Sequence, residues 1–87
     1  MEGNQDLQAV GREIRRLRRG VGLSQEQLAE RAGLHRNYVG LLERGERNAS
    51  LTTLFAVARS LGVSLGELFS NIPVATKVGR ERRARKR

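Results

Sequence analysis

The sequence predicts an all-α fold of five helices. Apolar residues recur three and four positions apart in several stretches of the 87-residue chain, whereas no stretch alternates apolar and polar residues as a half-buried strand would. Serines followed three positions later by Gln or Glu indicate helix starts, and glycines follow the apolar stripes where helices would end. A chain of this length is expected to form one small domain.

The first expected helix begins at Leu7 and ends near Gly20, because glycine adopts a left-handed conformation at little cost. Its apolar stripe consists of Leu7, Val10, Ile14 and Leu17. Residues 1–6 are expected to precede it as an N-terminal arm. Residues 7–72 are then the helical domain.

The second and third helices are expected to form a close pair. Ser24 and Gln27 make a capping box, and Gly33 ends the second helix. Only three residues separate Ala32 from the next helical pattern, which starts near Arg36, and this spacing is typical of a helix-turn-helix. Val39 and Leu42 face inward in the third helix, and its outward face holds Arg36, Asn37, Gly40, Leu41 and Arg44.

The fourth helix is expected to run from the cap residue Ser50 to Gly62, and the fifth begins at a capping box of Ser64 and Glu67. A core of this size stabilises a monomer only modestly, so a homodimer is expected. The candidate subunit contacts are Leu65, Leu68, Phe69 and Ile72. The alternative is that these four side chains belong to the core of the monomer.

The positive charge is concentrated at the C-terminus. The chain has 17 basic and 9 acidic residues, and residues 77–87 contain seven of the basic ones and a single glutamate. We expect residues 73–87 to be a disordered basic tail, because the segment has almost no apolar side chains to bury. Such a tail either improves solubility or lies along DNA phosphates.

The composition argues against an enzyme. The chain has one His, one Asp, no Cys and no Gly-rich phosphate loop, so we predict neither a metal site nor a cofactor. His35, at the start of the third helix, is interpreted as a helix cap or a phosphate contact. No apolar run approaches the length of a membrane helix, and we expect a cytoplasmic protein with no membrane partner.

Four strings are informative together: IRRLR (14–18), LSQEQLA (23–29), AGL (32–34) and LERGERNASL (42–51). In their order and spacing they resemble the lambda-repressor and Cro type of helix-turn-helix regulator. GLHRNYV followed by ERGERN resembles most the controller proteins of bacterial restriction-modification systems. The resemblance implies a five-helix, lambda-repressor-like fold whose third helix enters the major groove of DNA.

The same resemblance implies roles for the outward-facing residues. Arg36 and Asn37 occupy positions that read base edges, where Arg suits guanine and an amide suits adenine. Leu41 is either a contact to a thymine methyl group or an incidental surface leucine. The tolerance of Gly40 inside a helix is attributed to a close approach of DNA. The expected contacts to the DNA backbone are Gln25, Tyr38, Arg44, Arg47 and Asn48.

Two assignments include a structural role. The Tyr38 hydroxyl donates to a phosphate, or the Tyr38 ring braces the third helix against the domain. Arg18 and Glu43 match positions that form a partly buried ion pair between the first and third helices.

The predicted function is sequence-specific regulation of transcription by a homodimer on a pseudo-palindromic operator, with RNA polymerase as a possible further partner. Two alternatives are open. One is a protein-bridging adaptor that holds nucleic acid only through its tail, and the other is the antitoxin of a toxin-antitoxin pair.

Overall fold

The computed structural model describes residues 2–72, and this part of the chain contains five α-helices and no strand. The helices are α1 (Glu2–Gly20), α2 (Gln25–Ala32), α3 (Arg36–Glu43), α4 (Leu51–Leu61) and α5 (Leu65–Phe69). The predicted fold class and the predicted order of elements are therefore confirmed. The described part has no helix that is both long enough and apolar enough to cross a membrane.

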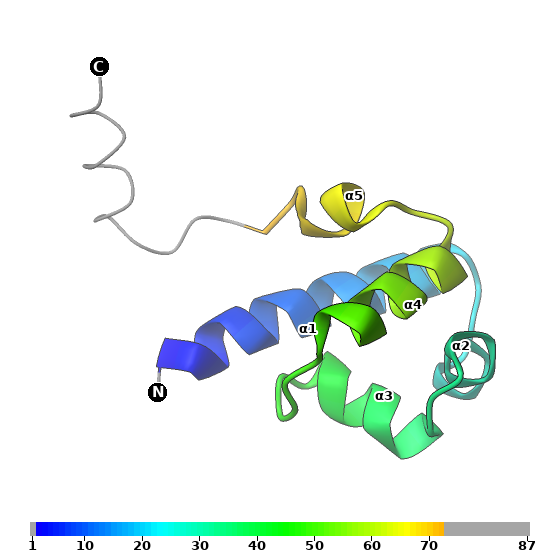
Figure 1. Ribbon diagram of the computed structural model, residues 1–87, viewed down its shortest axis with the longest axis horizontal. Helices are drawn as coiled ribbons and strands as arrows, with labels where there is room; N and C mark the ends of the chain where they lie inside the picture. The colour runs from blue at the N-terminus through cyan, green and yellow to red at the C-terminus, as the bar shows by residue number, and fades with distance from the viewer. Residues whose placement is uncertain (1, 73–87) are drawn as a thin grey trace.

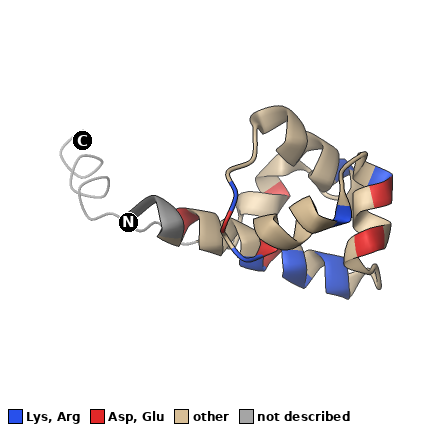
Figure 2. Cartoon of the chain, turned by 90° about the horizontal axis from the view of Figure 1, so that it is seen from below, with Lys and Arg blue, Asp and Glu red and all other residues tan. Residues whose placement is uncertain are grey.

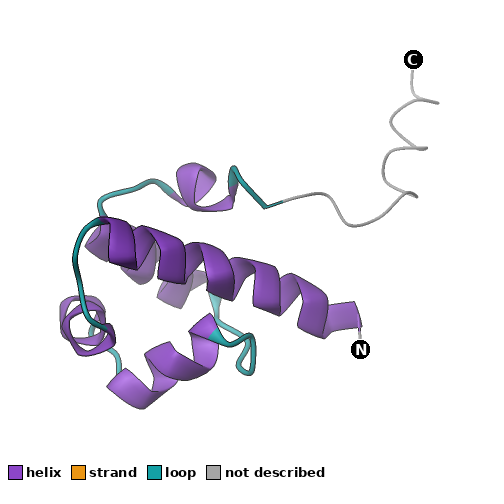
Figure 3. Cartoon of the chain, turned by 180° about the vertical axis from the view of Figure 1, so that it is seen from behind, coloured by secondary structure: helices purple, strands orange, loops and turns teal. Residues whose placement is uncertain are grey.

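Helix α1 is the long element against which the rest of the domain is arranged (Figure 1). It contacts α3, α4 and α5, while α2 contacts α3 and α4. Figures 1 and 3, which view opposite sides, both place α5 on one side of α1 and the α2–α3 pair on the other. The helix-turn-helix therefore lies at one edge of the domain, where α3 can meet a partner without displacing the core.

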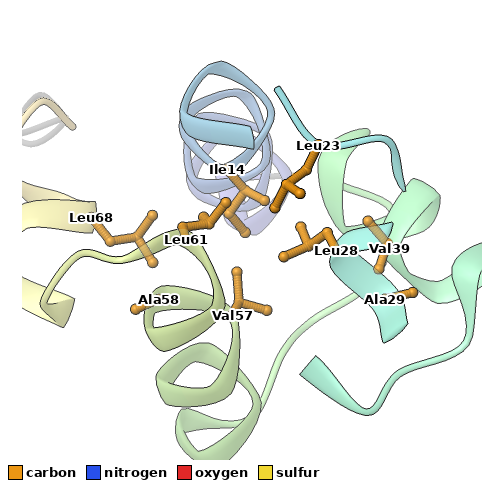
Figure 4. Close-up of a cluster of buried hydrophobic side chains, with 9 residues drawn as sticks. All are labelled: Ile14, Leu23, Leu28, Ala29, Val39, Val57, Ala58, Leu61 and Leu68. Atoms are coloured by element: carbon orange, nitrogen blue, oxygen red, sulfur yellow. The ribbon is translucent and has the colours of Figure 1, made fainter. Parts of the chain in front are cut away.

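One apolar core joins all five helices (Figure 4). Its most buried large side chains are Ile14 of α1, Leu28 of α2, Val39 of α3, Val57 of α4 and Leu68 of α5. Leu23, in the turn between α1 and α2, closes the core beside Leu28. Of the inward positions predicted from the three- and four-residue spacing, Ile14, Val39 and Leu42 are buried, while Leu7, Val10 and Leu17 are half-buried.

Serine side chains cap three of the helices as predicted. The Ser24 hydroxyl accepts from the Gln27 amide at 3.0 Å, while the Gln27 side chain accepts from the Ser24 amide at 2.8 Å. Ser64 and Glu67 form the same reciprocal pair at the start of α5. At α4, the Ser50 hydroxyl accepts from the Thr53 amide at 3.1 Å. Each cap satisfies a donor that would otherwise lack a partner inside its helix.

The predicted end of the first helix at Gly20 is confirmed, but two other details of that helix differ from the prediction. Helix α1 begins at Glu2, so residues 2–6 are helical and do not form an arm before the helix. Gly20 is the last helical residue, and the left-handed residue is Gly22, with a φ of 80°. The predicted basic tail, residues 73–87, lies outside the described residues.

Helix α1 approaches the end of α3 so closely that two glycines are required. A Cβ atom on Gly11 would lie against the carbonyl oxygens of Leu42 and Glu43, 2.5 Å from the latter. Gly45, just after α3, has a φ of 74°, and a Cβ there would lie 2.7 Å from the Cα of Gln8. These contacts fix where α3 ends relative to α1.

The interpretation of Leu68 as a subunit contact is also wrong. Leu68 is fully buried in the monomer, because α5 turns it toward Val57 and Leu61 in the core. Leu65 and Ile72 are half-buried, and Leu65 packs against the same core. Phe69 is the one exposed residue among the four predicted interface residues, with 37% of its surface accessible.

Candidate DNA-binding surface

The turn between α2 and α3 is held by backbone geometry and one side chain. Gly33 adopts a left-handed conformation, with a φ of 72°, and the Leu34 amide donates to the Ala29 carbonyl at 2.8 Å. His35 then caps α3, since its Nδ1 accepts from the Asn37 amide at 3.1 Å. The interpretation of His35 as a cap is therefore confirmed, and the imidazole helps to define where α3 begins.

The face of α3 that points away from the core carries the predicted base-reading residues. Arg36 and Asn37 are exposed in its first turn, and Leu41 is half-buried one turn later. A shallow hollow on this face brings most of the predicted contact residues together: Gln25, Arg36, Asn37, Gly40, Leu41 and Arg44. The hollow combines guanidinium and amide donors with one apolar side chain. In a major groove, such donors can hydrogen-bond to base edges, and an apolar side chain can contact a thymine methyl group.

Gly40 differs from its expected environment. It is buried, because the side chains of Arg44 and Gln25 cover it. A Cβ there would lie 3.4 Å from Nη1 of Arg44 and 3.7 Å from Oε1 of Gln25, which is ordinary or slightly tight contact. Gly40 therefore lies on the outward side of α3, as the helical wheel predicts, but it is not exposed. The side chains of Gln25 and Arg44 form the surface above it.

Glu43 organises the base of the site. Arg18 donates to it through Nε at 2.6 Å and through Nη2 at 3.0 Å, and both residues are buried. The remaining terminal nitrogen of Arg18 donates to the Leu23 carbonyl at 2.8 Å. The ion pair predicted between the ends of α1 and α3 is present, and its buried donors and acceptors are satisfied.

The Gln25 side chain is engaged by the same carboxylate. Its Nε2 donates to Oε1 of Glu43 at 3.0 Å, which ties the first turn of α2 to the last turn of α3. The resemblance predicts only a DNA contact for Gln25, and no local spacing signals a bond between positions 18 residues apart. In the free domain, the amide is thus held in place rather than pointing freely to solvent.

Tyr38 braces the loop that follows α3. Its hydroxyl donates to the Asn48 carbonyl at 3.3 Å, and the guanidinium of Arg47 lies 6.0 Å from the centre of its ring. The structure therefore brings together three of the predicted backbone-contact residues, Tyr38, Arg47 and Asn48, in α3 and the loop that follows it. In the free domain the Tyr38 hydroxyl is thus used within the protein, in a contact to the following loop that neither expectation for this residue described.

Two carboxylates that the sequence analysis did not assign to the site lie beside its arginines. Glu26 faces Arg36, with 3.7 Å between Oε1 and Nη1, and Glu46 accepts from Nε of Arg44 at 3.2 Å. All four side chains are exposed. Figure 2 views the domain from the side of α3. Basic and acidic segments are mixed on this side, and several basic segments lie along α1.

Residues 2–72 offer no metal site, since no three His, Cys, Asp or Glu side chains gather there as ligands would. The hollows beside α3 are open and shallow rather than enclosed as a substrate pocket would be.

Comparison with known proteins identifies the family. The sequence pattern of the helix-turn-helix family matches residues 14–68. The control protein C.SmaI of Serratia marcescens is 49% identical over 57 residues, which are 66% of this chain and 68% of that protein. The control protein C.MunI of Mycoplasma is 41% identical over 63 residues, covering 71% of this chain and 85% of that protein.

A solved structure agrees with these sequence matches. The restriction-modification controller protein C.AhdI from Aeromonas hydrophila superposes with a TM-score of 0.73 and is 48% identical, over 75% of this chain and 98% of that one. The family match begins within α1 and ends within α5, so it includes the α2–α3 pair that carries the exposed Arg36 and Asn37. The chain therefore belongs to the helix-turn-helix family of transcription regulators and is not an enzyme.

Proposed function

We propose that the chain regulates transcription as a homodimer that binds a pseudo-palindromic operator in double-stranded DNA, as a controller protein of a restriction-modification system does. The observation that carries the proposal is the exposed face of α3, where Arg36 and Asn37 stand together at the start of a helix at the edge of the domain. A helix presented in this way fits the major groove.

Arg36 and Asn37 are the proposed base readers. A guanidinium donates two hydrogen bonds to O6 and N7 of guanine, and an amide both donates to and accepts from adenine. Each such pair supplies about 1 to 3 kcal/mol of discrimination. Leu41, half-buried one turn later on the same face, offers methyl groups to a thymine.

The proposed backbone contacts surround these readers. Gln25, held by Glu43, stands at the start of α2, where backbone amides also favour a phosphate. Arg44 lies at the other end of α3, and the Tyr38 hydrogen bond keeps Arg47 and Asn48 in the following loop within the same surface. Contacts of this kind orient the protein without reading sequence.

The proposed dimer interface lies on α4 and α5, which pack against each other. Leu51 and Phe55, four residues apart on α4, are 62% and 42% exposed, and Phe69 of α5 is 37% exposed. Half-buried Leu65 and Ile72 complete the proposed contact residues. Binding to a pseudo-palindromic operator requires a two-fold axis that sets the two copies of α3 about 34 Å apart, one turn of DNA.

The proposal includes two cellular expectations. The protein acts in the bacterial cytoplasm and associates with the nucleoid when it is bound to DNA. Occupancy of a promoter is enough for repression, whereas activation would require a contact with RNA polymerase.

Selection from a random duplex library at about 150 mM salt tests the proposal. Four proteins are compared: the full chain, Arg36→Ala, Arg12→Ala and a chain ending at Thr76. Arg12 is an exposed arginine on α1, so its variant loses the same charge at a site outside α3 and outside the proposed dimer interface.

The expected result is a palindromic motif that Arg36→Ala loses and that Arg12→Ala and the truncated chain retain. If no motif emerges and all DNA retention disappears with the tail, the α3 surface is not a DNA reader. The protein would then act as an adaptor that holds nucleic acid through residues 77–87.

A further inference from the structure

Glu26 stands beside the arginine to which we assign base reading. Its Oε1 lies 3.7 Å from Nη1 of Arg36, and the two side chains are 74% and 63% exposed. A groove between α2 and the start of α3 is lined by both residues together with Ala29, Glu30, Leu34 and His35. A carboxylate of the chain itself therefore lies next to the surface that would face DNA phosphates.

We propose that Glu26 is a positioning residue that increases discrimination between the operator and other sequences; this inference rests on the proposed function. A guanidinium has five N–H donors in a planar fork. With one terminal nitrogen directed at Glu26, another edge of the fork remains free for two acceptors on guanine. Glu26 thus restricts the orientations of Arg36 before DNA is bound.

The carboxylate also disfavours the wrong complex. At the operator, Arg36 lies between guanine and Glu26, so the charge of Glu26 remains compensated. On other sequences the base edge lacks the two acceptors, and Arg36 turns to a phosphate. Glu26 then faces the negatively charged DNA backbone without Arg36 beside it, and the like charges of carboxylate and phosphate repel. Both effects enlarge the difference between specific and non-specific binding.

Glu26→Gln tests this role with little risk to folding, because the side chain is exposed. The measured quantity is the ratio of affinities for the selected motif and for a duplex with its guanine replaced. The ratio is expected to fall about two- to fivefold, the range of an exposed ion pair. Glu30→Gln is the matched control, since Glu30 is an exposed carboxylate one turn further along α2 in the same groove. Its ratio is expected to equal that of the full chain.

A double-mutant cycle separates positioning from a general charge effect. In an Arg36→Ala background, Glu26→Gln is expected to strengthen binding to both duplexes equally and to leave the ratio unchanged. The inference is overturned if Glu26→Gln leaves the ratio unchanged in the otherwise intact protein, or if Glu30→Gln lowers it equally. A full chain that selects no motif would overturn the proposed function, and the inference with it. A motif whose discrimination ignores Glu26 would overturn the inference alone.

Discussion

Arg18 and Glu43 form a buried two-point ion pair, with 2.6 Å from Nε to Oε2 and 3.0 Å from Nη2 to Oε1. The pair joins the end of α1 to the end of α3, and the same carboxylate also accepts from Gln25 in α2. Three helices therefore meet at one buried carboxylate, which holds Gln25 at the edge of the hollow lined by Arg36 and Asn37. This arrangement makes the orientation of α3 dependent on a residue that would not itself touch DNA.

Glu43→Ala is expected to lower the free energy of unfolding by about 3 to 5 kcal/mol, because it leaves the Arg18 guanidinium buried without its counter-charge. Thermal unfolding followed by circular dichroism measures the loss. Arg18→Met/Glu43→Leu is the control, since removing both charges avoids the uncompensated ion and is expected to cost less. An unfolding midpoint of Glu43→Ala equal to that of the unmodified chain would contradict the role given to this pair.

Gly11→Ala is expected to destabilise the domain by about 1 to 3 kcal/mol, because the added methyl group would press against the backbone of α3 and neither helix can yield independently. Gly20→Ala, in the same helix, meets nothing within 4 Å and is expected to be neutral or slightly stabilising. Urea unfolding of the two variants checks the contrast. Equal stabilities would mean that α1 and α3 are not packed as closely as described.

Glu13 makes the stability depend on pH. The Arg16 guanidinium, which donates through Nε at 3.0 Å, lowers the pKa of the Glu13 carboxyl, while burial opposes the shift. The pKa of Glu13 is lower in the folded than in the unfolded chain. The contribution of the Glu13–Arg16 pair to the free energy of unfolding is therefore complete above about pH 4.3 and is lost as pH falls through the folded pKa. Unfolding midpoints of the unmodified chain and of Glu13→Gln are expected to converge in that acidic range. A difference that stays constant down to pH 2 would exclude this linkage.

Phe55→Ser is expected to weaken the proposed dimer by about 1 to 4 kcal/mol while the monomer stays folded, because the ring is exposed on α4 and is not part of the core. Sedimentation equilibrium over a range of concentrations measures the association constant. Val21→Ser removes another exposed apolar side chain, in the turn between α1 and α2, and serves as the control. Equal association constants for the two variants would place the interface elsewhere.

The features that the sequence predicted are local ones. The capping boxes at Ser24 and Ser64 and the turn at Gly33 depend on residues within four positions of each other, so spacing alone identifies them. The family resemblance supplied the Arg18–Glu43 pair, which spans 25 positions and has no local signal. Residues 2–6 carry no apolar stripe, so periodicity gave no reason to extend α1 to Glu2.

The features that the sequence missed depend on how the helices pack. A helical wheel places Gly40 outward but does not show that Gln25 and Arg44 fold over it. Likewise, apolar Leu68 and Phe69 are adjacent in the sequence, and only the tilt of α5 decides that one is buried and the other exposed. The pairing of Glu26 with Arg36 joins two helices across the turn, beyond any spacing rule within one helix.

The most direct test of base reading by α3 replaces the guanine assigned to Arg36 in the selected motif with 7-deazaguanine, which lacks the N7 acceptor. The full chain is expected to lose part of the 1 to 3 kcal/mol that a two-bond Arg–guanine contact supplies, roughly 1 kcal/mol, in a binding titration. Arg36→Ala, which has no guanidinium to lose the bond, is expected to bind both duplexes equally. An equal loss in the two proteins, or no loss in the full chain, would contradict the assignment of Arg36 as the reader.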